Sequence, residues 1–126
     1  MPVRALLIAL AAALAVPGIA EARYEPFQSP SGAIRCAYLA GDGIAKQIRC
    51  DASFLNDRAA VLKVRGKARI QKVTDTVGDP EAPVLDYGES RRFGRLRCTS
   101  RRSGMRCRST RSGHGFLLSR ERQKVY

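Results

Sequence analysis

Apolar and polar residues alternate along most short segments of the chain, and no segment repeats its apolar residues with the 3.6-residue period of a helix. The alternating segments recur about every 8–12 residues, and stretches containing Gly, Pro and Ser separate them. This is the pattern of antiparallel strands joined by turns. The sequence therefore predicts an all-β fold, a small antiparallel sandwich or barrel that is built from hairpins and closed by disulfides.

Each of the four cysteines follows an arginine, and an apolar residue precedes that arginine. The pattern occupies residues 34–36, 48–50, 96–98 and 105–107. The first two segments flank a Gly-Asp-Gly turn and the last two flank a turn through Ser103 and Gly104, so each pair predicts a hairpin. Because side chains alternate along a strand, each cysteine shares a face with the apolar residue two positions before it.

The four cysteines allow three pairings, and the hairpin pattern predicts Cys36–Cys50 and Cys98–Cys107. A reactive or metal-binding thiol site is disfavoured, because the chain has no CxxC motif. Disulfides of this kind are typical of small exported domains.

The middle of the chain predicts further short strands. Residues 61–65 and 68–73 flank Gly66-Lys67, which suits a two-residue type II′ turn. Residues 74–83 predict a loop, and 84–88 and 90–93 predict two short strands that meet at a turn. After the strand-like residues 116–118, the segment 119–124 fits either a strand or one helical turn with Ser119 as its N-cap.

The N-terminus has the parts of a secretory signal peptide. One arginine precedes an unbroken apolar run over 5–16, and a Pro-Gly break and Ala20-Glu21-Ala22 follow. We therefore expect a signal peptide over 1–22, a loose leader over 23–32, and a single β-domain over 33–126. Because of the signal peptide, we expect the mature chain outside the cytoplasm, either in a periplasm or released. No run of 18 apolar residues is present, so the expected mature chain has no transmembrane segment.

Charge is concentrated near the C-terminus. The chain carries a formal charge of +12, and residues 91–126 hold eleven arginines, one lysine and a single acid. Strand alternation around Cys98 predicts Phe93, Arg95 and Arg97 on one face and Leu96 and Cys98 on the other. We expect an anion-binding patch, because the guanidinium fork matches phosphate and carboxylate groups. Its predicted contacts are Arg95, Arg97, Arg101, Arg102, Arg106 and Arg108.

The expected partner of this patch is an anionic envelope polymer, a glycolipid or an acidic protein, and no cofactor is expected. Nucleic acid is disfavoured, because export separates the protein from it and the aromatic residues are too few for a stacking series. The alternative is a solvated surface without a ligand, since the whole chain favours arginine, with 18 Arg against five Lys.

A small ribonuclease-like hydrolase is the enzymatic alternative to a binding domain. His114 is the only histidine, and it would act as general acid or base with Asp86, Glu89 or Glu121 as its partner. We expect no enzyme, because no spacing fixes any of these acids beside His114 and no catalytic motif is present. No metal site is expected either, because Asp75 and Asp79 lie in a loop that lacks the calcium-binding pattern. A further alternative is an inhibitor of an exported hydrolase.

Five motifs follow one another along the chain: Ser31-Gly32-Ala33-Ile34-Arg35-Cys36, Leu85-Asp86-Tyr87-Gly88, Cys98-Thr99-Ser100, Gly104-Met105-Arg106-Cys107 and Gly113-His114-Gly115-Phe116-Leu117-Leu118-Ser119-Arg120. In this order they resemble a family of uncharacterised bacterial exported proteins. The resemblance runs from about Phe27 to the C-terminus. This chain lacks two further cysteines that members usually carry in the middle. The resemblance implies an exported domain of unknown function, and it implies no activity.

Overall fold

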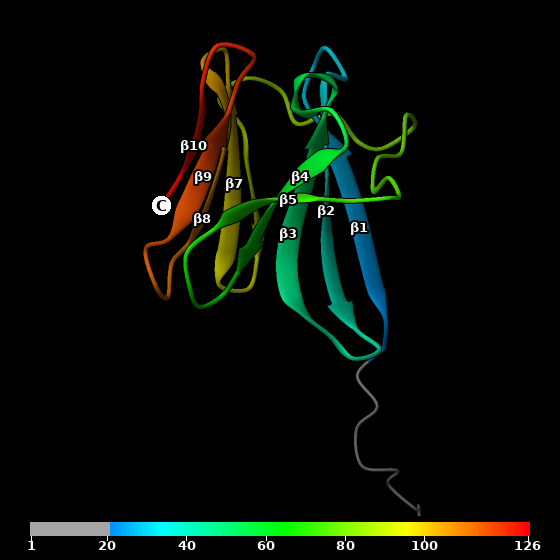
Figure 1. The fold of residues 1–126 in the computed structure, drawn as a ribbon, viewed down its shortest axis with the longest axis vertical. Coiled ribbons are helices and arrows are strands. Elements are labelled where there is room, and N and C mark those ends of the chain that lie inside the picture. Colours follow the sequence, from blue (N-terminus) through cyan, green and yellow to red (C-terminus); the bar gives the residue numbers. More distant parts are fainter. Residues whose placement is uncertain (1–20) are drawn as a thin grey trace, which may run out of the picture.

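Two five-stranded antiparallel sheets form the fold, and the computed structural model describes residues 21–126 (Figure 1). The first sheet contains β1 (Arg23–Gln28), β2 (Ile34–Gly41), β3 (Ile44–Ala52), β4 (Arg58–Lys63) and β5 (Arg69–Lys72), with a 3-10 turn, η1 (Ser53–Leu55), between β3 and β4. The second sheet contains β6 (Ser90–Phe93), β7 (Leu96–Arg101), β8 (Gly104–Ser109), β9 (Gly115–Leu118) and β10 (Gln123–Val125). The all-β prediction is confirmed.

The N-terminal residues 1–20 lie outside the described part of the chain, and so does most of the expected signal peptide. Within residues 21–126, no helix is long and apolar enough to cross a membrane.

The expected loose leader over 23–32 is wrong in its first part, because residues 23–28 form β1. This strand pairs with β2 over its full length, and its buried Phe27 lies opposite Cys36. The two prolines and few apolar residues of this segment argued against a strand. Because β1 is at the edge of its sheet, a position where proline is tolerated, Pro26 does not prevent the strand from forming.

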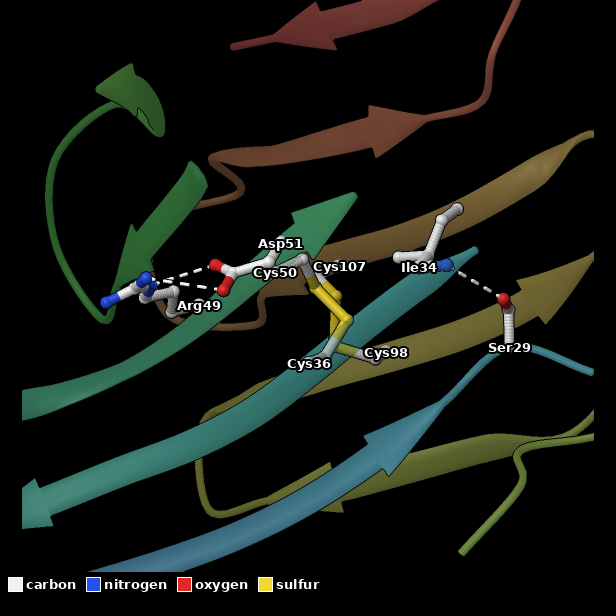
Figure 2. The surroundings of a disulfide bond; sticks show 8 residues. All are labelled: Ser29, Ile34, Cys36, Arg49, Cys50, Asp51, Cys98 and Cys107. Atoms are coloured by element: carbon white, nitrogen blue, oxygen red, sulfur yellow. Dashed lines mark hydrogen bonds and ion pairs between the residues drawn. A yellow bond between two sulfur atoms is a disulfide. The ribbon is translucent and has the colours of Figure 1, made fainter. Parts of the chain in front are cut away.

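The strands of each sheet follow one another in sequence order, so neighbouring strands are joined by hairpins or short connections. The hairpins at Asp42-Gly43 and Arg102-Ser103 place each predicted cysteine pair directly opposite. Cys36–Cys50 and Cys98–Cys107 are disulfide-bonded, as predicted. Both disulfides are fully buried in the cluster of apolar side chains between the two sheets, and Figure 2 shows them in that space.

Aromatic stacking joins the two sheets within this core. The ring of Phe93 on β6 lies 5.7 Å from Phe27 and 4.9 Å from Tyr38, both on the first sheet. Phe93 is therefore buried, and the prediction that it shares a face with Arg95 and Arg97 is wrong. The reason is the tight turn at Gly94-Arg95, which pairs Phe93 with Leu96 and so gives both the core-facing orientation.

The connection between β4 and β5 is longer than the predicted two-residue turn, because the last ladder pair is Val61–Arg69. Residues in this connection bond to the second sheet instead of to each other. The Ser109 hydroxyl donates to the Val64 carbonyl at 2.6 Å, and the Ala68 amide donates to the Tyr126 carbonyl at 3.3 Å. The extra length therefore ties the two sheets together.

The loop after β5 covers the outer face of the first sheet. Arg49 on β3 lies 2.9 Å from Asp51, and Figure 2 shows this ion pair. Arg49 also lies 2.8 Å from Asp75, and the Val77 amide donates to Asp51 at 2.8 Å. The hydrogen bond from the Arg49 guanidinium lowers the pKa of the Asp75 carboxyl below its ordinary value. The hydroxyl of Tyr24 on β1 holds the loop at the Val77 carbonyl, 2.7 Å away.

The predicted strand over 84–88 is reduced to a single bridge between Val84 and Gln28. The remainder turns through Gly88, whose positive φ of 88° does not fit a strand, and enters β6 at Ser90. At the other end of the chain, Ser119 accepts a hydrogen bond from the Arg122 amide at 3.0 Å, and this turn leads into β10. The strand alternative for this segment is thus correct for its last residues.

Candidate anion-binding face

The outer face of the second sheet carries the basic residues. Along β7 the buried residues Leu96, Cys98 and Ser100 alternate with outward-facing Arg97, Thr99 and Arg101. On β8, Met105 and Cys107 enter the core while Arg106 and Arg108 are exposed. The alternation is set by the core-facing Cys98 and Cys107, so the arginines next to these two cysteines lie on the opposite, outer side of the sheet.

The ladder registers place these side chains in rows across the sheet. Arg92 on β6 lies opposite Arg97, and Arg97 lies opposite Arg108 on β8. In the next row Arg106 lies opposite Thr99 and Leu117, and Lys124 on β10 lies opposite Leu117. We call these six cations the basic face: Arg92, Arg97, Arg101, Arg106, Arg108 and Lys124.

No carboxylate balances the basic face within the described residues. The outward positions of its five strands carry no Asp or Glu. The ion pairs found in residues 21–126 use Arg23, Arg49 and Arg91, and none uses a cation of the basic face. Since like charges directly opposite on neighbouring strands destabilise a sheet, the row Arg92–Arg97–Arg108 costs the fold stability when no anion is bound.

Small hydroxyl side chains and one aromatic ring lie among the cations. The Ser90 and Thr99 hydroxyls lie 2.7 Å apart, and the Arg97 guanidinium donates to Ser90 at 3.2 Å. Tyr126 pairs with Gly115 through two backbone hydrogen bonds of 2.9 Å, and its ring lies 5.8 Å from the Lys124 ammonium. The face therefore offers guanidinium, hydroxyl and aromatic groups together.

Four of the six predicted contacts lie on the basic face: Arg97, Arg101, Arg106 and Arg108. Arg95 and Arg102 do not, because each occupies a hairpin turn, and these turns lie at opposite ends of β7. The Arg102 guanidinium lies 5.1 Å from the centroid of the Tyr87 ring. The patch is thus divided between a strand face and two turns.

Arg92 and Lys124 also belong to the basic face, although the sequence pattern did not predict them as contacts. For Arg92 the signal was present, because the Gly94-Arg95 turn aligns residue 92 with residue 97 across the hairpin. For Lys124 no local signal existed. Its side depends on the pairing of β10 with β9, which follows from the Ser119–Arg122 turn.

His114 lies at the opposite end of the second sheet from its three candidate partners. It precedes β9 beside the Gly115–Arg108 pair, and its amide donates to the Ser112 hydroxyl at 3.3 Å. Glu121 lies in the turn that follows β9, and Glu89 precedes β6, where its carbonyl accepts from the Ser100 amide. Asp86 lies in the same turn as Glu89. The geometry therefore assembles no His–carboxylate pair from these residues.

Comparison with known proteins identifies a family for the chain but no activity. Residues 43–126 match the profile of a family of unknown function (DUF6636), which is two thirds of the chain and spans the second sheet completely. A search of curated proteins and a search of solved structures each found no match.

Proposed function

Since the chain belongs to this family of unknown function (DUF6636), no activity is inherited, and we propose that it is an exported, non-enzymatic domain that binds an anionic polymer through the basic face. The ligand class is a chain of repeated phosphate, sulfate or carboxylate groups in the cell envelope or outside the cell. Arg92, Arg97 and Arg108 contact one stretch of the polymer, and Arg106 with Lys124 contacts the next.

One observation carries the proposal: six cations share a face without a carboxylate, and three of them lie directly opposite one another. A merely basic composition would distribute arginines over both sheets and pair some of them with acids. On the first sheet Arg49 is paired in this way with Asp51 and Asp75. A bound polyanion removes the mutual repulsion of the row, so binding and folding stabilise each other.

The proposal includes export. The signal-peptide pattern over residues 1–22 supports it, as do two disulfides that persist in oxidising compartments and not in the reducing cytoplasm. In those compartments the abundant polyanions are polysaccharides and phosphate-bearing polymers or lipids. Their spacing of charges suits strand rows, which repeat about every 7 Å on one face.

The test measures binding of heparin, as a soluble polyanion, and of phosphatidylglycerol vesicles at salt concentrations between about 50 and 200 mM. The binding variant is the triple substitution Arg97→Gln, Arg106→Gln and Arg108→Gln. The control is Lys63→Gln, Lys67→Gln and Arg69→Gln, which removes the same charge from the exposed β4–β5 region of the first sheet. Circular dichroism checks that both variants fold.

We expect the wild-type affinity to fall steeply with salt, with a slope in log–log form that drops by about 3 in the binding variant, roughly one unit for each lost contact. The control should keep the wild-type slope. Equal losses in the two triple variants would show that net charge alone attracts the polymer, and absence of binding at low salt would leave the basic face without this role. Binding of heparin in preference to vesicles supports a polymer, and a preference for vesicles would replace the polymer with a lipid surface.

A further inference from the structure

A cavity of about 610 Å³ lies between the two sheets at the end that holds the Gly94-Arg95 turn. It is distinct from the basic face and shares only Arg92 with it. Its lining residues are Arg23, Tyr38, Lys46, Val64, Arg92, Phe93, Gly94 and Arg95. Four of these eight residues are cations. Within residues 21–126, no carboxylate belongs to the lining. The volume lies in the range of small-molecule sites.

The four cations converge through folding and not through a run of arginines in the sequence. Arg23 is on β1 and Lys46 is on β3, in the part of the chain whose bases and acids are nearly balanced. Arg92 and Arg95 come from β6 and its turn, about 50 residues farther along the chain. Bias toward arginine near the C-terminus therefore accounts at most for Arg92 and Arg95, and not for Arg23 and Lys46.

Two stacked aromatic rings supply the apolar part of the cavity lining. Tyr38 and Phe93 are buried and stacked, with ring planes 10° apart. The Arg23 guanidinium lies 5.1 Å from the centroid of the Tyr38 ring and 2.5 Å from Glu25 on the same strand. These contacts orient the Arg23 side chain, which is 55% exposed, across the Tyr38 ring at the edge of the cavity.

One cation of the cluster, Arg23, has an ion pair, and its partner Glu25 is shared with a second arginine. Glu25 contacts Arg23 and also Arg91, at 3.8 Å. Two arginines therefore divide one carboxylate, and the Lys46, Arg92 and Arg95 side chains have no ion pair within residues 21–126. An adjoining cavity shares Arg23, Tyr38 and Lys46 and is also lined by Glu21 and Asp42. Acidic residues therefore lie on the Arg23 and Lys46 side, and none lines the cavity beside Arg95.

We propose that this cavity binds the phosphate group of a small phosphorylated molecule. Four cations around one opening favour an oxyanion with two or more charges over a single carboxylate, because each added ligand charge interacts with every cation. Arginine forks donate two parallel hydrogen bonds to phosphate oxygens, and the aromatic floor leaves an apolar surface for the carbon part of the ligand. This inference does not depend on polymer binding at the basic face.

The test is a titration of the isotope-labelled protein with sodium pyrophosphate, and with acetate at equal ionic strength, followed by backbone amide NMR shifts. The variant Lys46→Gln with Arg95→Gln alters the cavity and none of the six cations of the basic face. The matched control, Arg111→Gln with Arg122→Gln, removes the same charge from two exposed positions that line no part of this cavity.

We expect saturable pyrophosphate shifts at Lys46, Gly94 and Arg95, with a dissociation constant that rises by about tenfold or more in the cavity variant and stays unchanged in the control. Acetate should bind at least about tenfold more weakly than pyrophosphate. Shifts spread evenly over the basic residues, equal losses in both variants, or equal binding of acetate would each overturn the proposal. Heparin binding measured on the same cavity variant reports separately on the basic face.

Discussion

Neutralising Arg97 should stabilise the protein at low salt, because this residue has a like charge directly opposite on each side. Arg92 is its partner on β6 and Arg108 is its partner on β8. The substitution Arg97→Gln removes both repulsions and keeps an uncharged polar side chain on the solvent side of the strand. It gives up only one exposed hydrogen bond, from the Arg97 guanidinium to the Ser90 hydroxyl, and leaves the core-facing side of β7 unchanged.

The size of the effect follows from the register. Opposite Cβ atoms on neighbouring strands lie about 5 Å apart, and long side chains can splay their charged ends to about 7 Å. At that distance two unit charges in water repel by about 0.6 kcal/mol, so two pairs give about 1.2 kcal/mol without screening. With a Debye length of about 30 Å in 10 mM salt the value is about 1 kcal/mol, and with about 3 Å in 1 M salt it falls to about 0.1 kcal/mol.

Thermal unfolding followed by circular dichroism measures this difference. A gain of about 1 kcal/mol corresponds to an increase in Tm of about 4–8 °C for a domain of this size, and we expect it in 10 mM salt and not in 1 M salt. Arg97→Lys is the control, since it keeps the charge and should leave the salt dependence of Tm as in the wild type. A lower Tm for Arg97→Gln at every salt concentration would refute the argument, because it would mean that Arg97 is held by contacts and not opposed by its neighbours.

Three further predictions concern the fold that displays the two sites. Phe93→Ala should cost about 3–5 kcal/mol in urea unfolding, because it empties the space between Phe27 and Tyr38, and a loss below about 1 kcal/mol would contradict their stacking as a link between the sheets. Gly115→Ala should cost about 1–3 kcal/mol in the same assay, since the added Cβ would lie 2.3 Å from the Cys107 carbonyl oxygen, and an unchanged stability would disprove this close approach. The lowered pKa of Asp75 means that its pairing with Arg49 stabilises the protein above the ordinary carboxyl pKa of about 4, and that this stabilisation is lost as pH falls through the lower folded value. Asp75→Asn should therefore weaken the acid dependence of Tm. An identical pH profile in that variant would show that the pair does not stabilise the loop.

Strand alternation and turn residues were sufficient to predict the two cysteine hairpins. Both signals are local, and the buried cysteines confirm the faces of Leu96 and Met105 as well as the pairings. The same local rules did not predict β1, because its Pro26 and polar neighbours acquire strand structure only by pairing with β2. Tertiary pairing overrides intrinsic preference in that segment.

The basic face was predicted in part, and the division has a physical cause. Arg97, Arg106 and Arg108 are each adjacent in sequence to a core residue, so alternation alone determines their direction. Arg95 was assigned to the strand because the sequence does not state where β6 ends and the turn begins. Convergence of Arg23 and Lys46 with Arg95 was beyond the sequence, since it depends on how the two sheets pack.

The cross-strand position of Cys98 and Cys107 has a consequence for how the chain acquires its charged surface. A slip of β8 along β7 by one residue would exchange inward and outward side chains, burying guanidinium groups and exposing apolar ones. The covalent bond joins the two residues that face each other only in the correct alignment. Formation of this disulfide therefore selects the correct register of β7 and β8. Once the bond has formed, the arginines beside Cys98 and Cys107 remain on the solvent side of the sheet.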